Sequence, residues 1–170
     1  HTGPVIPLNE LMNLYDAVVV ATGCDLARKL DLPGAELKGV INARDFVGWY
    51  NAEPTFNNLE LPDVSDELRS VIIGHGNVAL DCARVLAAPS SHLEATDIHA
   101  TAFEALQRLP SKRMIHVVGR RGATQAAFTT KEVRELTELD NAALVIDPAE
   151  LREGDTDASL KEGKARPLAR

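Results

Sequence analysis

The sequence is poor in cysteine and has no long apolar run. Its 170 residues include only two cysteines, Cys24 and Cys82, which lie far apart and form no C-x-x-C pair. This usage argues against a dithiol redox centre or a zinc site and favours a reducing compartment. The five histidines lack metal-ligand spacing. From the cysteines and histidines we expect no metal centre. The longest clear apolar run, Ala17–Ala21, has only the length of a strand, so we also expect no membrane span.

Basic residues are outnumbered by acidic ones, which gives a formal net charge of −7 at pH 7. Such a chain repels phosphate backbones, so we expect no nucleic-acid partner, although a local basic site for a small anion is compatible with it. The sequence lacks an initiator methionine, and its first residues (HTGP) show no targeting signal. We therefore interpret it as part of a longer protein and expect a monomer.

Four short apolar runs predict strands: AVVVA at 17–21, VII at 71–73, MIHVV at 114–118 and ALVI at 143–146. Continuous runs of this kind are typical of strands buried on both faces of a parallel sheet. Three stretches between them have helical patterning, at 77–88, 96–109 and 129–139, with caps expected at Thr96 or Asp97 and at Thr130. The alternation predicts an α/β fold, a Rossmann-like three-layer domain with a mainly parallel sheet.

The most informative stretch follows the second of these runs and has the pattern G-x-G-x-x-A, from Gly74 to Ala79. Gly74 allows a tight turn off the strand, Gly76 leaves room for a pyrophosphate, and Ala79 lets the next helix approach the sheet. The start of that helix, at Asn77 and Val78, offers free N–H groups to phosphates. The pattern predicts a dinucleotide site. A structural glycine turn or a methyltransferase-like nucleotide site are the alternatives.

A second motif, after the next strand, indicates which dinucleotide is bound. Gly119-Arg120-Arg121-Gly122 follows MIHVV at the position where an NAD site carries an acidic residue for the ribose 2′-hydroxyl. Two guanidinium groups there suit a 2′-phosphate. The motif favours NADP(H) over NAD and disfavours S-adenosylmethionine, with a solvated basic turn as the alternative. The long separation between the two motifs is explained if 89–110 is an insertion that contains an extra helix.

Several motifs occur in a fixed order along the chain. They are YDAVVVATG at 15–23, LPG at 32–34, FVGWYN at 46–51, GNVALD at 76–81, GRRG at 119–122 and QAAFT at 125–129. The set resembles the NADPH:adrenodoxin (ferredoxin) oxidoreductase family over about Tyr15 to Leu151. The resemblance implies the NADP domain of a two-domain flavoprotein of the glutathione-reductase type. In that family NADPH reduces FAD, which passes electrons to a [2Fe–2S] ferredoxin or adrenodoxin.

The resemblance also implies a domain organisation. Residues 1–14 would lead in from the FAD domain, 15–151 would form the NADP-binding domain, and the charged residues 152–170 would form a flexible tail. Most FAD contacts would lie outside this chain, so the isolated chain is expected to be inactive. Family members occur in mitochondria and in bacteria. The 89–97 segment favours the mitochondrial matrix, with the bacterial cytoplasm as the alternative.

The family's NADP contacts, carried over position by position, fall on Arg28, the Gly76–Ala79 turn, Arg120, Arg121 and Glu132. Glu135 matches a catalytic-site glutamate near the nicotinamide and is expected to orient its amide. The alternative for Arg28 is an ordinary surface arginine, and for Glu135 an exposed helix carboxylate. His75 replaces the family's usual small amide, and we expect its side chain to point away from the phosphates.

Two rival functions are compatible with the motifs. Glutamate-synthase small-subunit-like flavoproteins also carry a G-x-G-N-V-A turn and paired arginines, but FVGWYN and the long insertion disfavour them. A non-enzymatic NADPH-sensing domain would bind the dinucleotide without a flavin. We expect FVGWYN to be a packed structural element in which Trp49 lies in the core, rather than a flavin-stacking segment.

Overall fold

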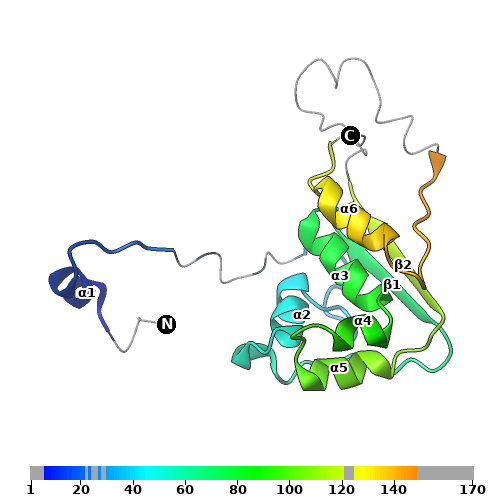
Figure 1. Ribbon diagram of the computed structural model, residues 1–170, viewed down its shortest axis with the longest axis horizontal. Helices are drawn as coiled ribbons and strands as arrows, with labels where there is room; N and C mark the ends of the chain where they lie inside the picture. The colour runs from blue at the N-terminus through cyan, green and yellow to red at the C-terminus, as the bar shows by residue number, and fades with distance from the viewer. Residues whose placement is uncertain (1–5, 22, 24–26, 28–29, 121–124, 149–170) are drawn as a thin grey trace, which may run out of the picture. The chain divides into compact units, whose positions relative to one another are not determined.

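The computed structural model of the protein describes residues 6–21, 23, 27, 30–120 and 125–148 (Figure 1). The chain forms two compact units, His1–Leu32 and Pro33–Arg170. None of the helices in the described ranges combines the length and the apolar character that a membrane crossing needs.

Among its described residues, the first unit contains one short helix, α1 (Leu8–Leu14), and the backbone becomes extended at Tyr15. The next segment, Ala17–Ala21, runs without a pairing strand, and Val19 is 87% exposed. The strand predicted at 17–21 is therefore not formed. A strand is stabilised when its N–H and C=O groups pair with those of a neighbour, and none of the described segments pairs with this one.

The second unit is built on a two-stranded parallel sheet. Strand β1 (Leu68–Ile73) pairs with β2 (Arg113–Val118), in a register that runs from Leu68 opposite Arg113 to Ile73 opposite Val118. Two of the predicted strands and their parallel direction are confirmed. The prediction of a strand at 143–146 is wrong, because this segment is unpaired and Val145 is 87% exposed. β-branched residues favour an extended backbone but do not supply the neighbour that a strand needs.

The two faces of this sheet differ in their cover, because half-buried and exposed residues alternate along both strands. Inner side chains such as Ile72, Ile115 and Val117 pack against the helical core. On the outer face, Val71 and Ile73 are 64% and 60% exposed. The prediction that both faces are buried is therefore wrong for the described residues. They form an α/β structure in which helices cover one face of a small parallel sheet.

Helix α3 (Asn77–Ala87) follows β1 and packs along the inner face of the sheet (Figure 1). It matches the helix predicted at 77–88 and ends before Pro89. Two further helices, α2 (Ala43–Tyr50) and α6 (Thr130–Thr137), pack against α3. A 3-10 turn, η1 (Pro54–Phe56), follows α2 in the otherwise irregular connection that leads to β1.

Two helix starts differ from the predicted ones. The insertion at 89–110 holds two helices, α4 (Ser90–Glu94) and α5 (Ala100–Gln107), so α5 begins after His99 and not at Thr96 or Asp97. The Thr96 hydroxyl instead donates to the Leu93 carbonyl oxygen at 2.6 Å. Threonine side chains often bond to nearby backbone groups in this way, and here the bond satisfies a carbonyl group in the last turn of α4.

Helix α6 has Thr129 as its N-terminal flanking residue, one position before the predicted cap at Thr130. Both threonines are chemically suited to the start of a helix, so the residue type alone does not decide between them. The Thr129 hydroxyl donates to the Glu132 carboxylate three residues later. This contact joins two side chains of the first turn, and the Thr129 side chain forms no hydrogen bond with an N–H group of the helix.

The core of the second unit is aromatic at one end. Trp49 and Leu106 are its largest fully buried side chains. The Phe46 ring centroid lies 5.7 Å from that of Trp49 and 5.4 Å from that of Tyr50. FVGWYN is thus a packed structural element, as expected. Helix α5 packs against α2, so the insertion contributes Leu106 to the same core.

Arg113, at the start of β2, ties the C-terminal end of α3 to the sheet. Its Nε donates to the Pro110 carbonyl oxygen at 2.8 Å, and its Nη1 donates to the carbonyl oxygens of Leu86 at 2.6 Å and Ala88 at 3.3 Å. The last carbonyl groups of a helix have no partner within the helix. Arg113 supplies one, and burial lowers the pKa of its guanidinium.

Arg113→Met should lower the free energy of unfolding by about 2–4 kcal/mol, because it removes charge-assisted hydrogen bonds to partly buried carbonyl groups. Urea denaturation measures this loss. Arg69→Met is the matched control on β1, since Arg69 is 73% exposed and pairs with Glu67 at the surface. The control should change stability by less than about 1 kcal/mol. Equal losses in the two variants would contradict a role for Arg113 in joining α3 to the sheet.

Candidate functional site

The two predicted nucleotide motifs meet at one edge of the sheet. Because β1 and β2 are parallel and in register, their carboxyl ends lie side by side, and Gly74 N–H donates to the Val118 carbonyl oxygen at 2.8 Å. Ligands of open parallel sheets bind at this edge. A pocket of about 300 Å³ lies there, and it is lined by Ile73, Gly74, His75, Gly76, Val118, Arg120 and Ala127.

Both fingerprint glycines leave open space beside the backbone. Gly74 has a φ of 129°, a conformation that L side chains rarely adopt, and a Cβ added to it would meet no atom within 4 Å. A Cβ added to Gly76 would find only ordinary contact, with the Ala127 Cβ at 4.0 Å as the nearest atom. The turn therefore leaves room for a ligand to approach the main chain, as the motif predicts.

Helix α3 begins directly at this turn, with Gly76 as its N-terminal flanking residue. The N–H groups of Ala79 and Leu80 donate to the Gly76 carbonyl oxygen at 3.0 and 3.2 Å. The N–H groups of Asn77 and Val78 precede them, at the end of the helix where the dipole is positive. Ala79 is buried, which agrees with its predicted role of letting the helix pack closely.

The segment 125–129 lies alongside the glycine turn, and the sequence did not predict this. Gly76 and Ala127 form an isolated parallel bridge, and Ala127 N–H donates to the His75 carbonyl oxygen at 3.3 Å. The Asn77 side chain accepts a hydrogen bond from Thr129 N–H at 2.8 Å. The carbonyl oxygen of the Asn77 side chain thus already accepts a hydrogen bond from within the protein. Asn77 fixes the start of α6 relative to the start of α3.

Glu132 and Glu135 lie on α6, and neither is among the described residues that line the pocket. Glu132 accepts the hydrogen bond from the Thr129 hydroxyl, in the first turn of the helix. The T-x-x-E spacing is typical of a capping box, but here the Thr129 N–H donates to Asn77 and the two side chains bond to each other. Glu135, whose side chain is 37% exposed, pairs with Arg84 Nε and Lys131 Nζ, each at 3.5 Å.

A side-chain network connects Glu135 to the core. Arg84 pairs with Asp81 as well as with Glu135, and the Tyr50 hydroxyl donates to the Asp81 carboxylate. Burial and the hydrogen bond to Asp81 raise the pKa of the Tyr50 hydroxyl well above its usual value. The network joins α2, α3 and α6 and holds α6 at a fixed position. Two cations, Arg84 and Lys131, contact the Glu135 carboxylate and orient it.

The electrostatic character of the pocket is set by Arg120, which is exposed at its mouth. Among the described residues, no carboxylate lines the pocket. A guanidinium beside an open glycine turn and a helix N-terminus fits the phosphates of a dinucleotide. Two other predicted contact residues, Arg28 and Arg121, lie outside the described residues.

The middle residue of the fingerprint, His75, is among the residues that line the pocket, and its ring packs over Gly119. The expectation that its side chain points away from the phosphates stays a prediction. The ring lies edge-on to that of Phe128, with 6.4 Å between the centroids. The sequence pattern gave no reason to assign it a role, because the x positions of G-x-G-x-x-A are unconstrained by the motif.

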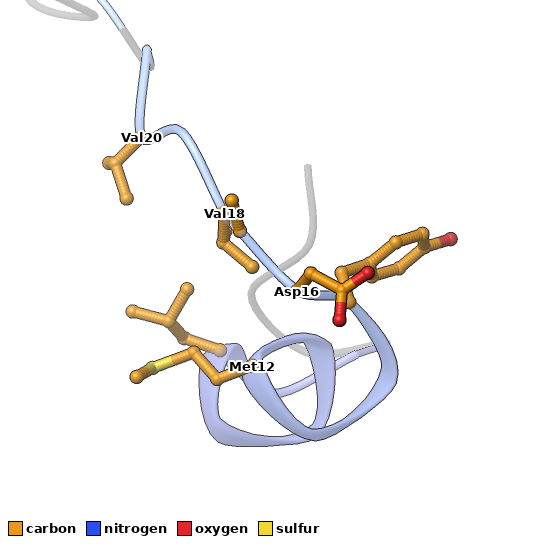
Figure 2. Close-up of a pocket in the computed structure, with 7 residues that line it drawn as sticks. Met12, Asp16, Val18 and Val20 are labelled. Carbon is orange, nitrogen blue, oxygen red and sulfur yellow. The ribbon is translucent and has the colours of Figure 1, made fainter.

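A second pocket, of about 180 Å³, lies in the first unit, between α1 and the extended segment that follows it. Figure 2 shows that Met12 on α1 lies opposite Val18. Asp16 is the one charged residue that lines this pocket, and the others are apolar or aromatic. It therefore offers no cation to a phosphate group, and the dinucleotide motifs do not contribute to it.

Known proteins match the chain closely over a part of their length, although no protein-family model matches it. NADPH-ferredoxin reductase FprA of Mycobacterium tuberculosis (strain H37Rv) is 50% identical over 155 residues, which cover 91% of this chain and 33% of FprA. Mitochondrial NADPH:adrenodoxin oxidoreductase of Bos taurus is 48% identical over 151 residues, covering 88% of this chain and 30% of the relative.

The fold agrees with these matches. A solved structure of Mycobacterium tuberculosis FprA in complex with NADPH has a TM-score of 0.77 at 49% sequence identity, over 91% of this chain and 33% of that one. The chain is homologous to NADPH-ferredoxin reductases and NADPH:adrenodoxin oxidoreductases, and it spans about a third of their length. The resemblance identified from the motifs is confirmed, and the homologues are oxidoreductases.

Gly74→Ala should lower the free energy of unfolding by about 1–3 kcal/mol, because alanine is strained at a φ of 129°. No neighbouring atom would clash with the added methyl group, so the loss comes from the backbone alone. Gly76→Ala is the control, because its φ of −103° suits any residue. The control should change stability by less than about 0.5 kcal/mol in thermal or urea unfolding. Equal losses would show that the positive φ is not the cause.

Proposed function

We propose that this chain, homologous to about a third of the NADPH-ferredoxin and NADPH:adrenodoxin reductases, is the NADP(H)-binding part of such an enzyme. The complete reductase would pass electrons from NADPH through FAD to a [2Fe–2S] ferredoxin or adrenodoxin. The observation that carries the proposal is the meeting of the open glycine turn and Arg120 in one pocket. A relative at 49% identity that has been solved with NADPH supports it.

In this proposal the chain binds and orients the dinucleotide, which supplies a hydride when bound. The Gly74 and Gly76 turn and the first N–H groups of α3 hold the pyrophosphate. Arg120, together with Arg121, holds the 2′-phosphate through charge-assisted hydrogen bonds. Arg28 is a further proposed contact.

Helix α6 would serve the nicotinamide half of the site. Glu132 and Glu135 are the proposed residues, with Glu135 orienting the amide of the nicotinamide. The hydrogen bond from Thr129 to Glu132 and the ion pairs of Glu135 support this role, because they fix both carboxylates on a helix that Asn77 ties to the glycine turn. Side chains held in this way lose little freedom when a ligand binds.

The larger architecture is part of the same proposal. We infer a Rossmann-like three-layer NADP domain at 15–151 within a two-domain flavoprotein, preceded by a lead-in from the FAD domain at 1–14 and followed by a charged tail at 152–170. The apolar outer face of the sheet supports a third layer, since Val71, Ile73, Met114 and Val118 are exposed there. FAD would be bound mostly by residues outside this chain. The chain is proposed to act as a monomer.

The relatives differ in their location and agree on the kind of acceptor. The adrenodoxin oxidoreductases are mitochondrial and FprA is bacterial, so a mitochondrial matrix protein and a bacterial cytoplasmic one both fit the matches. Both kinds of relative support a ferredoxin-type acceptor, because their names specify ferredoxin or adrenodoxin.

Arg120→Ala combined with Arg121→Ala should weaken NADPH binding by about a hundredfold while NADH binding changes little, because two charge-assisted contacts to the 2′-phosphate are removed. Fluorescence titration of both cofactors measures the ratio. Arg108→Ala is the control, since Arg108 is exposed at the C-terminal end of α5 and pairs with Glu104. Comparable losses for NADPH and NADH would contradict the assignment of a 2′-phosphate site.

Joining this chain to the remaining two thirds of a reductase such as FprA should give a yellow protein that reduces ferredoxin with NADPH. The isolated chain should reduce no acceptor, because without FAD the hydride has nowhere to go. Absorbance near the flavin band and an acceptor assay measure the two outcomes. A joined protein that binds NADPH but neither holds flavin nor reduces ferredoxin would favour the sensing-domain alternative.

A further inference from the structure

His75 lies between the two fingerprint glycines, and its ring occupies the space over the end of β2. A Cβ added to Gly119 would lie 2.5 Å from both Cγ and Nδ1 of His75, closer than real side chains approach. On another side the ring contacts Phe128, at an interplanar angle of 81°. The imidazole is therefore wedged directly beside the residue that precedes Arg120.

One nitrogen of this ring has no partner. The Nε2 atom of His75 is buried, and none of the described residues forms a hydrogen bond with it. Buried polar atoms without partners are uncommon in native proteins, because burial removes the hydrogen bonds that water would make. A phenyl ring would fill the same space and contact Phe128 without this cost. Packing alone does not account for a histidine at this position.

His75 and Arg120 both line the pocket at the carboxyl ends of the strands, and no carboxylate does so among the described residues. The imidazole of a histidine carries an N–H donor. An anion held beside Arg120 would therefore lie next to a ring that can donate a hydrogen bond once it turns about its side-chain torsions.

We propose that His75 is a specificity-determining residue whose ring N–H donates a hydrogen bond to the 2′-phosphate held by Arg120. This inference rests on the proposed NADP(H) site and assigns it a second donor, one that the glycine–arginine pattern does not contain. A phosphate oxygen accepts such a bond, and the ribose 2′-hydroxyl of the unphosphorylated dinucleotide gains much less from it. His75 therefore increases discrimination between the two dinucleotides rather than affinity for both.

The test uses the 170-residue chain and two probes that differ by one phosphate, adenosine 2′,5′-bisphosphate and adenosine 5′-monophosphate. His75→Phe keeps the ring and its contacts with Phe128 and Gly119 but removes the nitrogens. By calorimetry, the variant should bind the bisphosphate at least about tenfold more weakly and the monophosphate as the wild type does. Unchanged affinity for the bisphosphate, or equal losses for both probes, would overturn the inference.

A second pair of variants covers the case in which His75→Phe does not fold. Glutamine and methionine have side chains of similar length, but only glutamine carries an N–H donor. His75→Gln should retain more preference for the bisphosphate than His75→Met, and equal preferences would overturn the inference. A wild-type chain with no preference for the bisphosphate would instead contradict the proposed NADP(H) site itself. A preference that survives in His75→Phe would contradict the role of His75 alone.

Discussion

The candidate site depends on the parallel, in-register pairing of β1 with β2. Because Ile73 lies opposite Val118, the glycine turn and Arg120 emerge at the same edge of the sheet, although a two-helix insertion separates them in the sequence. An antiparallel pair or a register shift would carry Arg120 away from the turn. The proposed binding of a phosphorylated dinucleotide follows from this one alignment, since a glycine turn and a guanidinium recognise different ends of the same ligand.

The surroundings of the site keep these elements in place through side chains with little freedom. Asn77 joins the start of α3 to the start of α6, and Arg113 secures the other end of α3. Tyr50, Asp81 and Arg84 extend the connection from the aromatic core to Glu135. Helix α3 is thus held at both ends and along its side. A ligand that contacts α3 and α6 together would meet a surface that is already ordered.

Sequence reasoning succeeded where the signal is local. The run VII, the glycine turn and the helix after it are consecutive, so one stretch of sequence specifies strand, turn and helix together. It failed where structure depends on distant partners: Ala17–Ala21 and 143–146 have the composition of strands but no neighbour to pair with in the described residues. The bond between Asn77 and Thr129 joins residues 52 positions apart and has no sequence signature. Composition also did not reveal that the described helices cover only one face of the sheet, because β-branched residues suit strands with one or two covered faces.

The close contact between His75 and Gly119 has a consequence for how such sequences can diverge. A methyl group at position 119 collides with the imidazole, whereas a small residue at position 75 would remove the obstacle. Substitutions at the two positions are therefore coupled in this structure: a larger residue at position 119 requires the imidazole of His75 to move or to be replaced by a smaller side chain.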